Sequence, residues 1–118
     1  MFTKRERYLD SYDDIVTYLK DFDFHDYRVG GFEFDLEKNE MKFYVEEIIP
    51  GKKLEDSAGK IWDFTFRYIE KCSFNLDLVL GLYIYDLHGG NEPGEIVLEG
   101  DGGNIYVASK EVSLGIPG

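Results

Sequence analysis

Apolar and polar residues alternate through much of this chain, and this period of two constrains its fold more than any other feature. The alternation is clearest in residues 32–37 and 41–46, which the turn residues 38–40 separate. Successive side chains of a strand point to opposite faces of a sheet, so each run has one apolar and one polar face. The pattern therefore predicts a β-hairpin with a single buried face. The residues expected on that face are Phe32, Phe34, Leu36, Met41, Phe43 and Val45.

Further runs extend the strand pattern. Residues 62–68 alternate, and the adjacent apolar residues Tyr68 and Ile69 predict a bulge or strand end at that point. Residues 76–85 are apolar on both faces, which predicts a central strand covered on both sides. A closing hairpin is expected at 95–99 and 104–108, with 111–114 continuing its second strand, loops at 50–59 and 88–94, and a tail at 116–118.

One helix is predicted before these strands. Ser11 can cap its first turn, where Asp13 and Asp14 complement the helix dipole. Apolar residues then recur at spacings of three and four and give the helix one apolar face. They are Tyr12, Ile15, Val16, Leu19 and Phe22, and the helix is expected to end near Lys20 or Phe22.

The fold class that follows is α+β. Short turns favour antiparallel pairing, because parallel strands need a crossover of a dozen or more residues. We expect one N-terminal helix packed on a twisted antiparallel sheet, or a mostly-β sandwich or roll. The 118 residues are expected to form a single domain, residues 1–118.

Charge limits the partners of the chain. Its 24 acidic and 13 basic residues give a net charge of −11, which disfavours nucleic acid and favours a basic protein as partner. Acidity also serves solubility. The N-terminal residues do not resemble a signal peptide, and no apolar stretch approaches the roughly 20 residues of a membrane span. A soluble, cytoplasmic protein is expected.

The sequence carries few patterns suited to catalysis or metal binding. Cys72 is the only cysteine, so an internal disulfide is excluded, and a buried thiol is favoured over a nucleophile. Asp86 and His88 share one face of a strand end, but no recognised ligand spacing includes them. The glycine-rich segments match no phosphate-binding fingerprint. We expect no catalytic residues, no metal and no cofactor, and hence no enzyme.

Phe24-His25-Asp26 joins the helix to the first hairpin. On an extended strand His25 and Asp26 would point to opposite faces and would not pair, whereas Asp23 would share the face of His25. His25 is interpreted as fixing the turn by hydrogen bonds. A general base or a ligand for a partner group is the alternative.

Four tyrosines of the expected strands are candidates for recognition, because some of them should reach a solvent-facing side. A tyrosine combines a rigid apolar ring with a polar hydroxyl, which suits it to protein interfaces. Plain packing is the competing interpretation. The candidate residues are Tyr44, Tyr68, Tyr83 and Tyr85.

The layout of residues 22–114 resembles a family of small bacterial Phe-His-Asp domains. The resemblance lies in residues 24–26, the hairpin segments 32–34 and 41–43, the strand 62–68 and the closing hairpin 102–107. Some members of that family are immunity proteins of polymorphic toxin systems. The resemblance implies a protein-binding role and supplies no catalytic residues.

Two functions therefore remain open. The first is a non-enzymatic protein-binding module of the immunity type, with a basic protein as partner and an undetermined oligomeric state. The second is a domain, or a weak enzyme, that binds a small molecule or carbohydrate through sheet tyrosines and carboxylates, with His25 in the pocket.

Overall fold

The computed structural model describes residues 5–48, 59–77 and 81–117, and the loop expected at 50–59 lies outside this range except for Gly59. One helix and seven antiparallel strands occupy the described residues, which confirms the predicted α+β class. They are β1 (Arg5–Leu9), α1 (Tyr12–Asp21), β2 (Arg28–Asp35), β3 (Glu40–Glu46), β4 (Ile61–Leu76), β5 (Tyr83–Gly89), β6 (Glu95–Asp101) and β7 (Gly103–Pro117).

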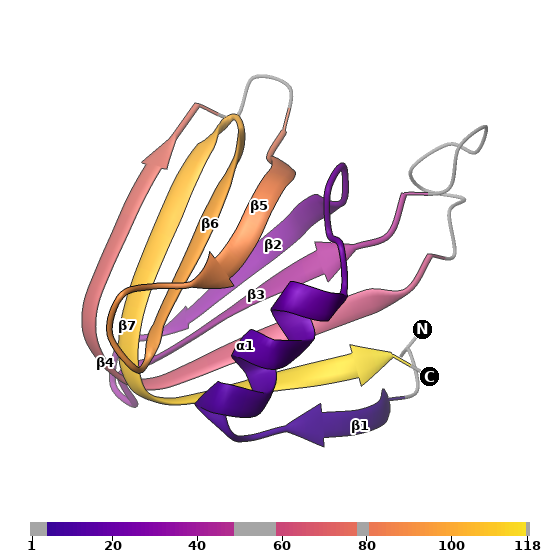
Figure 1. Cartoon of the computed structure of the whole chain (residues 1–118). Helices are drawn as coiled ribbons and strands as arrows, with labels where there is room; N and C mark the ends of the chain where they lie inside the picture. Colours follow the sequence, from indigo (N-terminus) through magenta and orange to yellow (C-terminus); the bar gives the residue numbers. More distant parts are fainter. Residues whose placement is uncertain (1–4, 49–58, 78–80, 118) are drawn as a thin grey trace.

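The strands close on themselves (Figure 1). Their order is β1-β7-β4-β3-β2-β5-β6, and β6 also pairs with β7, so six strands form a ring and β1 extends it at β7. The junction of β2 with β5 is short. Arg28 pairs there with Tyr83, and the Val29 N–H donates to the Leu82 carbonyl at 2.9 Å. Closure pairs β6, which would be an edge strand of the open sheet, and leaves β1 as an edge strand beside β7.

Strand β4 is long and has different neighbours along its length. The first part of β4, from Ile61 to Arg67, pairs with β3 and β7, whereas its later part pairs only with β7. Just after the first part, Tyr68 has a φ of 55°, and the register with β7 shifts between Ile69 and Lys71. The irregularity predicted at Tyr68 and Ile69 is thus confirmed, and it separates the two parts of the strand.

The interior of the ring is packed with aromatic and aliphatic side chains. Phe43 stacks on Phe64 at 4.8 Å and on Phe66 at 5.7 Å between ring centroids, and all three are fully buried. Cross-strand pairs on one face are the unit of sheet stabilisation, and here they fill the core. The buried faces predicted for residues 41–45 and 62–66 are confirmed.

The buried face predicted for residues 32–36 is wrong in part. Phe34 is 55% exposed and Leu36 is 90% exposed, whereas Phe32 is half-buried. Phe34 is in register with Met41 and so faces the same side of the sheet, but it lies near the end of β2, where its ring packs edge-on against Phe74. Leu36 comes after the strand, in the turn. Tyr68 alternates with the buried Phe64 and Phe66 in the sequence and would share their apolar face, but it is also exposed, at 55%.

Several segment boundaries differ from the prediction, and β5 runs two residues into the loop expected at 88–94. Strand β1 had not been expected, and the tail expected from residue 116 instead continues β7, where Ile116 pairs with Arg7. The single strand expected at 76–85 is divided, because β4 ends at Leu76 and β5 begins at Tyr83. Gly81 has a φ of 95° between them, in the left-handed region that extended strands do not use. Residues 78–80, in the middle of the strand expected at 76–85, lie outside the described residues.

Helix α1 has the predicted ends. The Ser11 hydroxyl accepts from the Asp14 backbone N–H at 3.4 Å, and Phe22 is the C-cap. Ile15 and Leu19 are buried, so the apolar stripe faces the strands as predicted. In Figure 1, α1 crosses in front of the strands, and it contacts β5, β7 and β1.

A polar network ties the start of α1 to β6. The Tyr12 hydroxyl donates to the Glu95 carbonyl at 2.9 Å, and the Tyr106 hydroxyl donates to the Glu95 carboxylate. The bond from Tyr106 lowers the pKa of Glu95, and the same bond raises the pKa of Tyr106. This network fixes the beginning of the helix against the closing hairpin.

Candidate functional site: the histidine cleft

The two histidines of the chain line one cleft, which we call the histidine cleft. It has a volume of about 290 Å³ and lies between the end of α1, the turn that follows and strand β5. Its lining consists of Leu19, Lys20 and residues 22–25 and 85–88. A larger hollow of about 500 Å³ between β1 and α1 has neither histidine nor cysteine in its lining.

A tight turn presents His25 at this cleft. The Tyr27 N–H donates to the Phe24 carbonyl at 2.9 Å, which makes His25 and Asp26 the central turn residues. The Asp23 carboxylate accepts from the His25 backbone N–H at 2.8 Å. The turn is thus fixed by the backbone and by Asp23, and the imidazole is left at the surface.

The expectation that His25 and Asp26 point to opposite faces is wrong. His25 Nδ1 lies 3.2 Å from a carboxylate oxygen of Asp26. The reason is the backbone, because Asp26 has a φ of 70° and does not continue a strand. The Asp26 N–H donates to the Ile84 carbonyl at 2.9 Å, which holds this conformation against β5. Both side chains are accessible, at 48% and 85% exposed.

Phe24 anchors the turn in the core. It is 3% exposed, and its ring packs at 5.2 Å from Trp62 and 4.7 Å from Phe22. The Trp62 indole N–H donates to the Tyr18 hydroxyl at 3.0 Å, so helix, turn and β4 meet in one aromatic cluster. The cluster gives the cleft a rigid floor, because close-packed rings leave little room for rearrangement.

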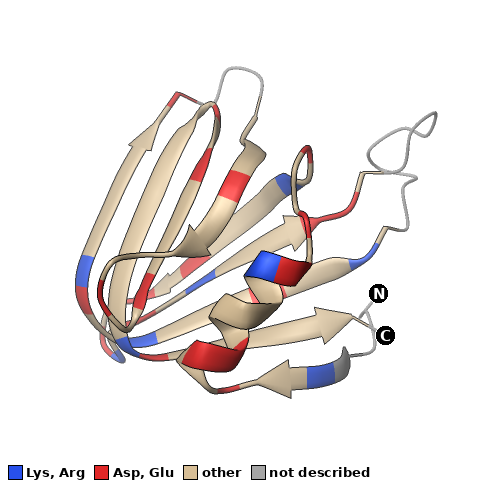
Figure 2. Ribbon diagram, in the orientation of Figure 1, with Lys and Arg blue, Asp and Glu red and all other residues tan. Residues whose placement is uncertain are grey.

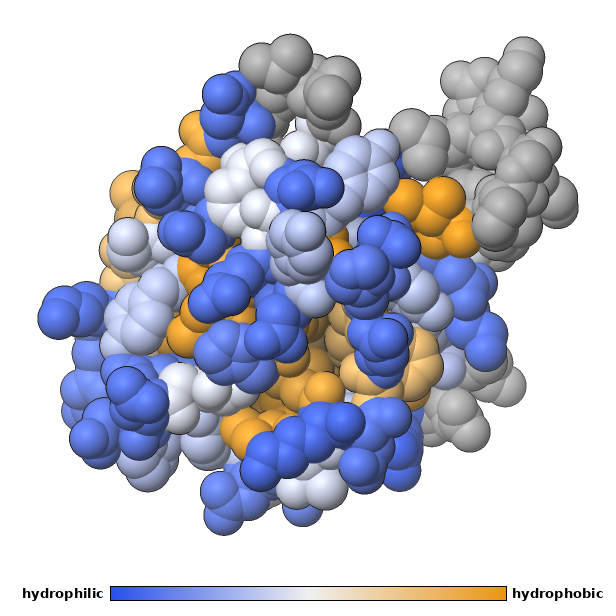
Figure 3. Space-filling view, turned by 45° about the horizontal axis from the view of Figure 1, so that its top comes forward, coloured by the Kyte–Doolittle hydropathy of each residue, from blue (hydrophilic) through white to orange (hydrophobic). Residues whose placement is uncertain are grey.

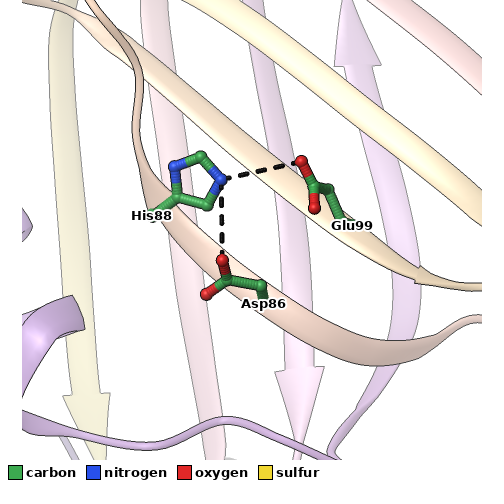
Figure 4. Close-up of side chains that lie close together, drawn as sticks. All are labelled: Asp86, His88 and Glu99. Carbon is green, nitrogen blue, oxygen red and sulfur yellow. Dashed lines mark ion pairs between the residues drawn. The ribbon is translucent and has the colours of Figure 1, made fainter.

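On the opposite wall, β5 contributes an aromatic ring and a second histidine. Tyr85 is 63% exposed, and its ring lies 5.6 Å from that of His25. His88 lies two residues after Asp86, so both project from the same side of the strand. His88 Nε2 is 3.7 Å from Asp86 and 3.8 Å from Glu99 of β6 (Figure 4).

The four tyrosines proposed for recognition do not form one surface. Tyr85 alone lines the histidine cleft. The Tyr44 hydroxyl donates to Glu33 at 2.6 Å on the β2–β3 hairpin, and Tyr68 lies at the irregularity of β4. Tyr83 is half-buried where β5 pairs with β2 and β6.

Cys72 lies on β4 and is exposed, contrary to the buried position favoured from the sequence. Partial desolvation by its surroundings raises the pKa of the thiol. A thiol with a raised pKa stays protonated near neutral pH and is a poor nucleophile. Cys72 is not among the residues that line the histidine cleft.

Within the described ranges, no helix has the length and apolar character needed to cross a bilayer. Comparison with protein-family models, curated proteins and solved structures finds no match for this chain.

Proposed function

We propose that this protein is a non-enzymatic recognition module that binds a basic protein through the histidine cleft. The observation that carries the proposal is an exposed aromatic ring, Tyr85, set among accessible carboxylates. The cleft residues include one lysine, Lys20, and no arginine. The carboxylates in or beside the cleft are Asp23, Asp26, Asp86 and Glu99.

The charge of the whole molecule supports a basic partner. Acidic residues are spread over the helix, the turns and the strands (Figure 2), and the net charge is −11. A surface of one sign accelerates encounter with the opposite sign, and salt weakens this steering. In Figure 3 hydrophilic residues cover most of the face drawn, and hydrophobic residues form smaller patches between them. Such a mixture is typical of a non-obligate interface.

Tyr85 is the residue on which we expect affinity to depend. An arginine or lysine of the partner can lie over its ring while the carboxylate of Asp86 pairs with the charge. Tyrosine is enriched among the few residues that dominate interface energetics. In this proposal the protein belongs with the immunity-type Phe-His-Asp domains and acts in the cytoplasm. Its single cysteine fits a compartment without structural disulfides.

The experiment is an affinity capture from the source organism at low salt, with wild type and two variants as baits. We expect wild type and Tyr68→Ala to enrich the same basic protein and Tyr85→Ala to lose it. Tyr68 is a matched control, because it is exposed to 55% but lies outside the cleft. With the captured protein purified, Tyr85→Ala should weaken binding by about 10-fold or more. Added salt should slow association more than it speeds dissociation.

Two outcomes would overturn the proposal. One is the absence of any basic protein whose capture depends on Tyr85. The other is an association rate that does not change with ionic strength, since a surface with this net charge must steer a basic partner.

A second candidate function is binding of a small molecule or carbohydrate, favoured by the cleft itself. Its volume of about 290 Å³ lies near the lower end of ligand sites, and Tyr85 and His25 offer rings for stacking. In a thermal-shift screen of sugars and small metabolites, a true ligand should stabilise wild type and Tyr68→Ala but not Tyr85→Ala. A screen in which no compound does so would remove this candidate.

A further inference from the structure

We propose that Asp86, His88 and Glu99 form a binding site for one divalent transition-metal ion, with Zn²⁺ as the expected ion. Each residue offers one ligand atom, and these three atoms all lie within 4.8 Å of one another. The site shares Asp86 and Glu99 with the surface of the proposed function, but its test uses zinc alone and no partner protein. It departs from the sequence-based expectation that the chain holds no metal.

The strand geometry brings the three side chains together. Asp86 and His88 project from the same side of β5, and Glu99 is the cross-strand partner of Asp86 on β6. A register shift between Ile84 and Asp86 sets that pairing. Bulges of this kind often re-aim a side chain near a functional site. Glu99 lies thirteen residues after Asp86, at a spacing that no local sequence pattern marks.

The distances suit a metal with nitrogen and oxygen ligands. His88 Nε2 lies 3.7 Å from Asp86 and 3.8 Å from Glu99 (Figure 4). Two ligands at the usual zinc distances of about 2.0 to 2.2 Å in tetrahedral geometry are separated by about 3.4 Å. The distances from His88 Nε2 to the two carboxylate oxygens would therefore have to shorten by a few tenths of an ångström. The carboxylates can move by this amount, because they are 63% and 58% exposed.

The orientation of His88 is a second, independent observation. Its Nδ1 lies 2.7 Å from the carbonyl oxygen of Gly89. A carbonyl oxygen only accepts, so Nδ1 carries a proton and donates it to this bond. In the neutral ring, Nε2 then holds the lone pair and faces both carboxylates. Metal-binding histidines are oriented in this way, with the other ring nitrogen donating to a carbonyl or carboxylate.

Asp86 and Glu99 are cross-strand partners, so a positive charge between their carboxylates would stabilise the fold. Like charges directly opposite each other on paired strands are destabilising. Either a bound cation or a protonated His88 can offset the repulsion, and the net charge of −11 raises the local concentration of cations. One imidazole and two carboxylates suit zinc or a similar transition metal better than Mg²⁺ or Ca²⁺, which prefer oxygen ligands alone.

Three protein ligands leave at least one coordination position open. Structural zinc sites are closed by four protein ligands, whereas exchangeable and catalytic sites keep a position for water or another molecule. Asp86 and His88 also line the histidine cleft, so the open position is expected on the side of that cleft.

The test is calorimetric titration of the full chain with zinc chloride near neutral pH. We expect saturable binding of one ion per chain, with affinity lowered at least about 10-fold in each of Asp86→Asn, His88→Gln and Glu99→Gln. His25→Gln is a matched control, because its imidazole is paired with the Asp26 carboxylate at 3.2 Å and does not belong to the group of three ligands. Cys72→Ser controls for the exposed thiol. Both controls should bind zinc as wild type does.

Nitrogen-15 spectra of the two imidazoles give a second readout that does not depend on the variants. Zinc should shift the Nε2 resonance of His88 and leave that of His25 in place. The proposal is overturned if no saturable binding occurs up to about 1 mM zinc, an affinity of about −4 kcal/mol. It is also overturned if His88→Gln binds as wild type does, or if His25→Gln loses as much affinity as His88→Gln.

Discussion

Replacing Trp62 with alanine is expected to lower the free energy of unfolding by about 3 to 5 kcal/mol, the range typical of a large buried aromatic residue. Trp62 is 2% exposed, and its ring lies 5.1 Å from Phe22, 5.2 Å from Phe24 and 5.5 Å from Tyr27. The change would leave a cavity where helix, turn and β4 meet. It would also leave the Tyr18 hydroxyl without its donor.

Urea denaturation followed by far-ultraviolet circular dichroism measures this effect, since Trp62 is the only tryptophan and fluorescence would be lost with it. Tyr18→Phe is the matched control. It removes the hydrogen bond and keeps the ring, so a loss of about 1 kcal/mol is expected. A loss below about 1 kcal/mol for Trp62→Ala would contradict the aromatic cluster as the centre of stability.

Replacing Gly103 with alanine is expected to destabilise the protein by about 2 to 3 kcal/mol. Gly103 begins β7 with a φ of 132°, which side chains of L-residues rarely allow. A β-carbon there would also overlap the carbonyl oxygen of Asn75 and approach the α-carbon of Leu76 to 2.8 Å. These are backbone atoms at the end of β4, so β7 would have to separate from β4.

Gly31→Ala provides the comparison on β2. A β-carbon at Gly31 would meet a ring atom of Tyr44 at 3.9 Å, an ordinary contact, and the change should stay within about 1 kcal/mol. Both variants can be measured by thermal and urea unfolding. Equal midpoints for Gly103→Ala and Gly31→Ala would show that the backbone at Gly103 is not strained by a side chain.

Features with local signals were predictable from the sequence. The helix from Ser11 to Phe22 could be read because its cap, its first-turn acids and its apolar spacing all lie within a dozen residues. The hairpin strand 40–46 could be read from its alternation. Strand β1 could not, because residues 5–9 carry little apolar periodicity and form a strand only by pairing with the distant end of β7. The burial of Phe34 was predicted wrongly, because alternation shows which face of the sheet a side chain is on but not whether other residues cover that face at the end of the strand.

The candidate site shows the same division. The shared face of Asp86 and His88 followed from their spacing. The closeness of His25 and Asp26 did not, because the prediction assumed extended backbone where Asp26 is left-handed. Glu99 was missed because its position opposite Asp86 depends on a register shift in β5. Turn conformation and strand register are set by tertiary contacts, and these are invisible in a single sequence.

The way β7 closes the ring has a consequence for biosynthesis. Residues 103–117 pair with β1, β4 and β6, so three strands made earlier lack their neighbour until this segment has left the ribosome. The nascent chain then carries unpaired edges and uncovered aromatic residues, the features that attract chaperones and promote aggregation. We therefore expect the ring to form after translation of β7, at the slow rate typical of distant strand pairings.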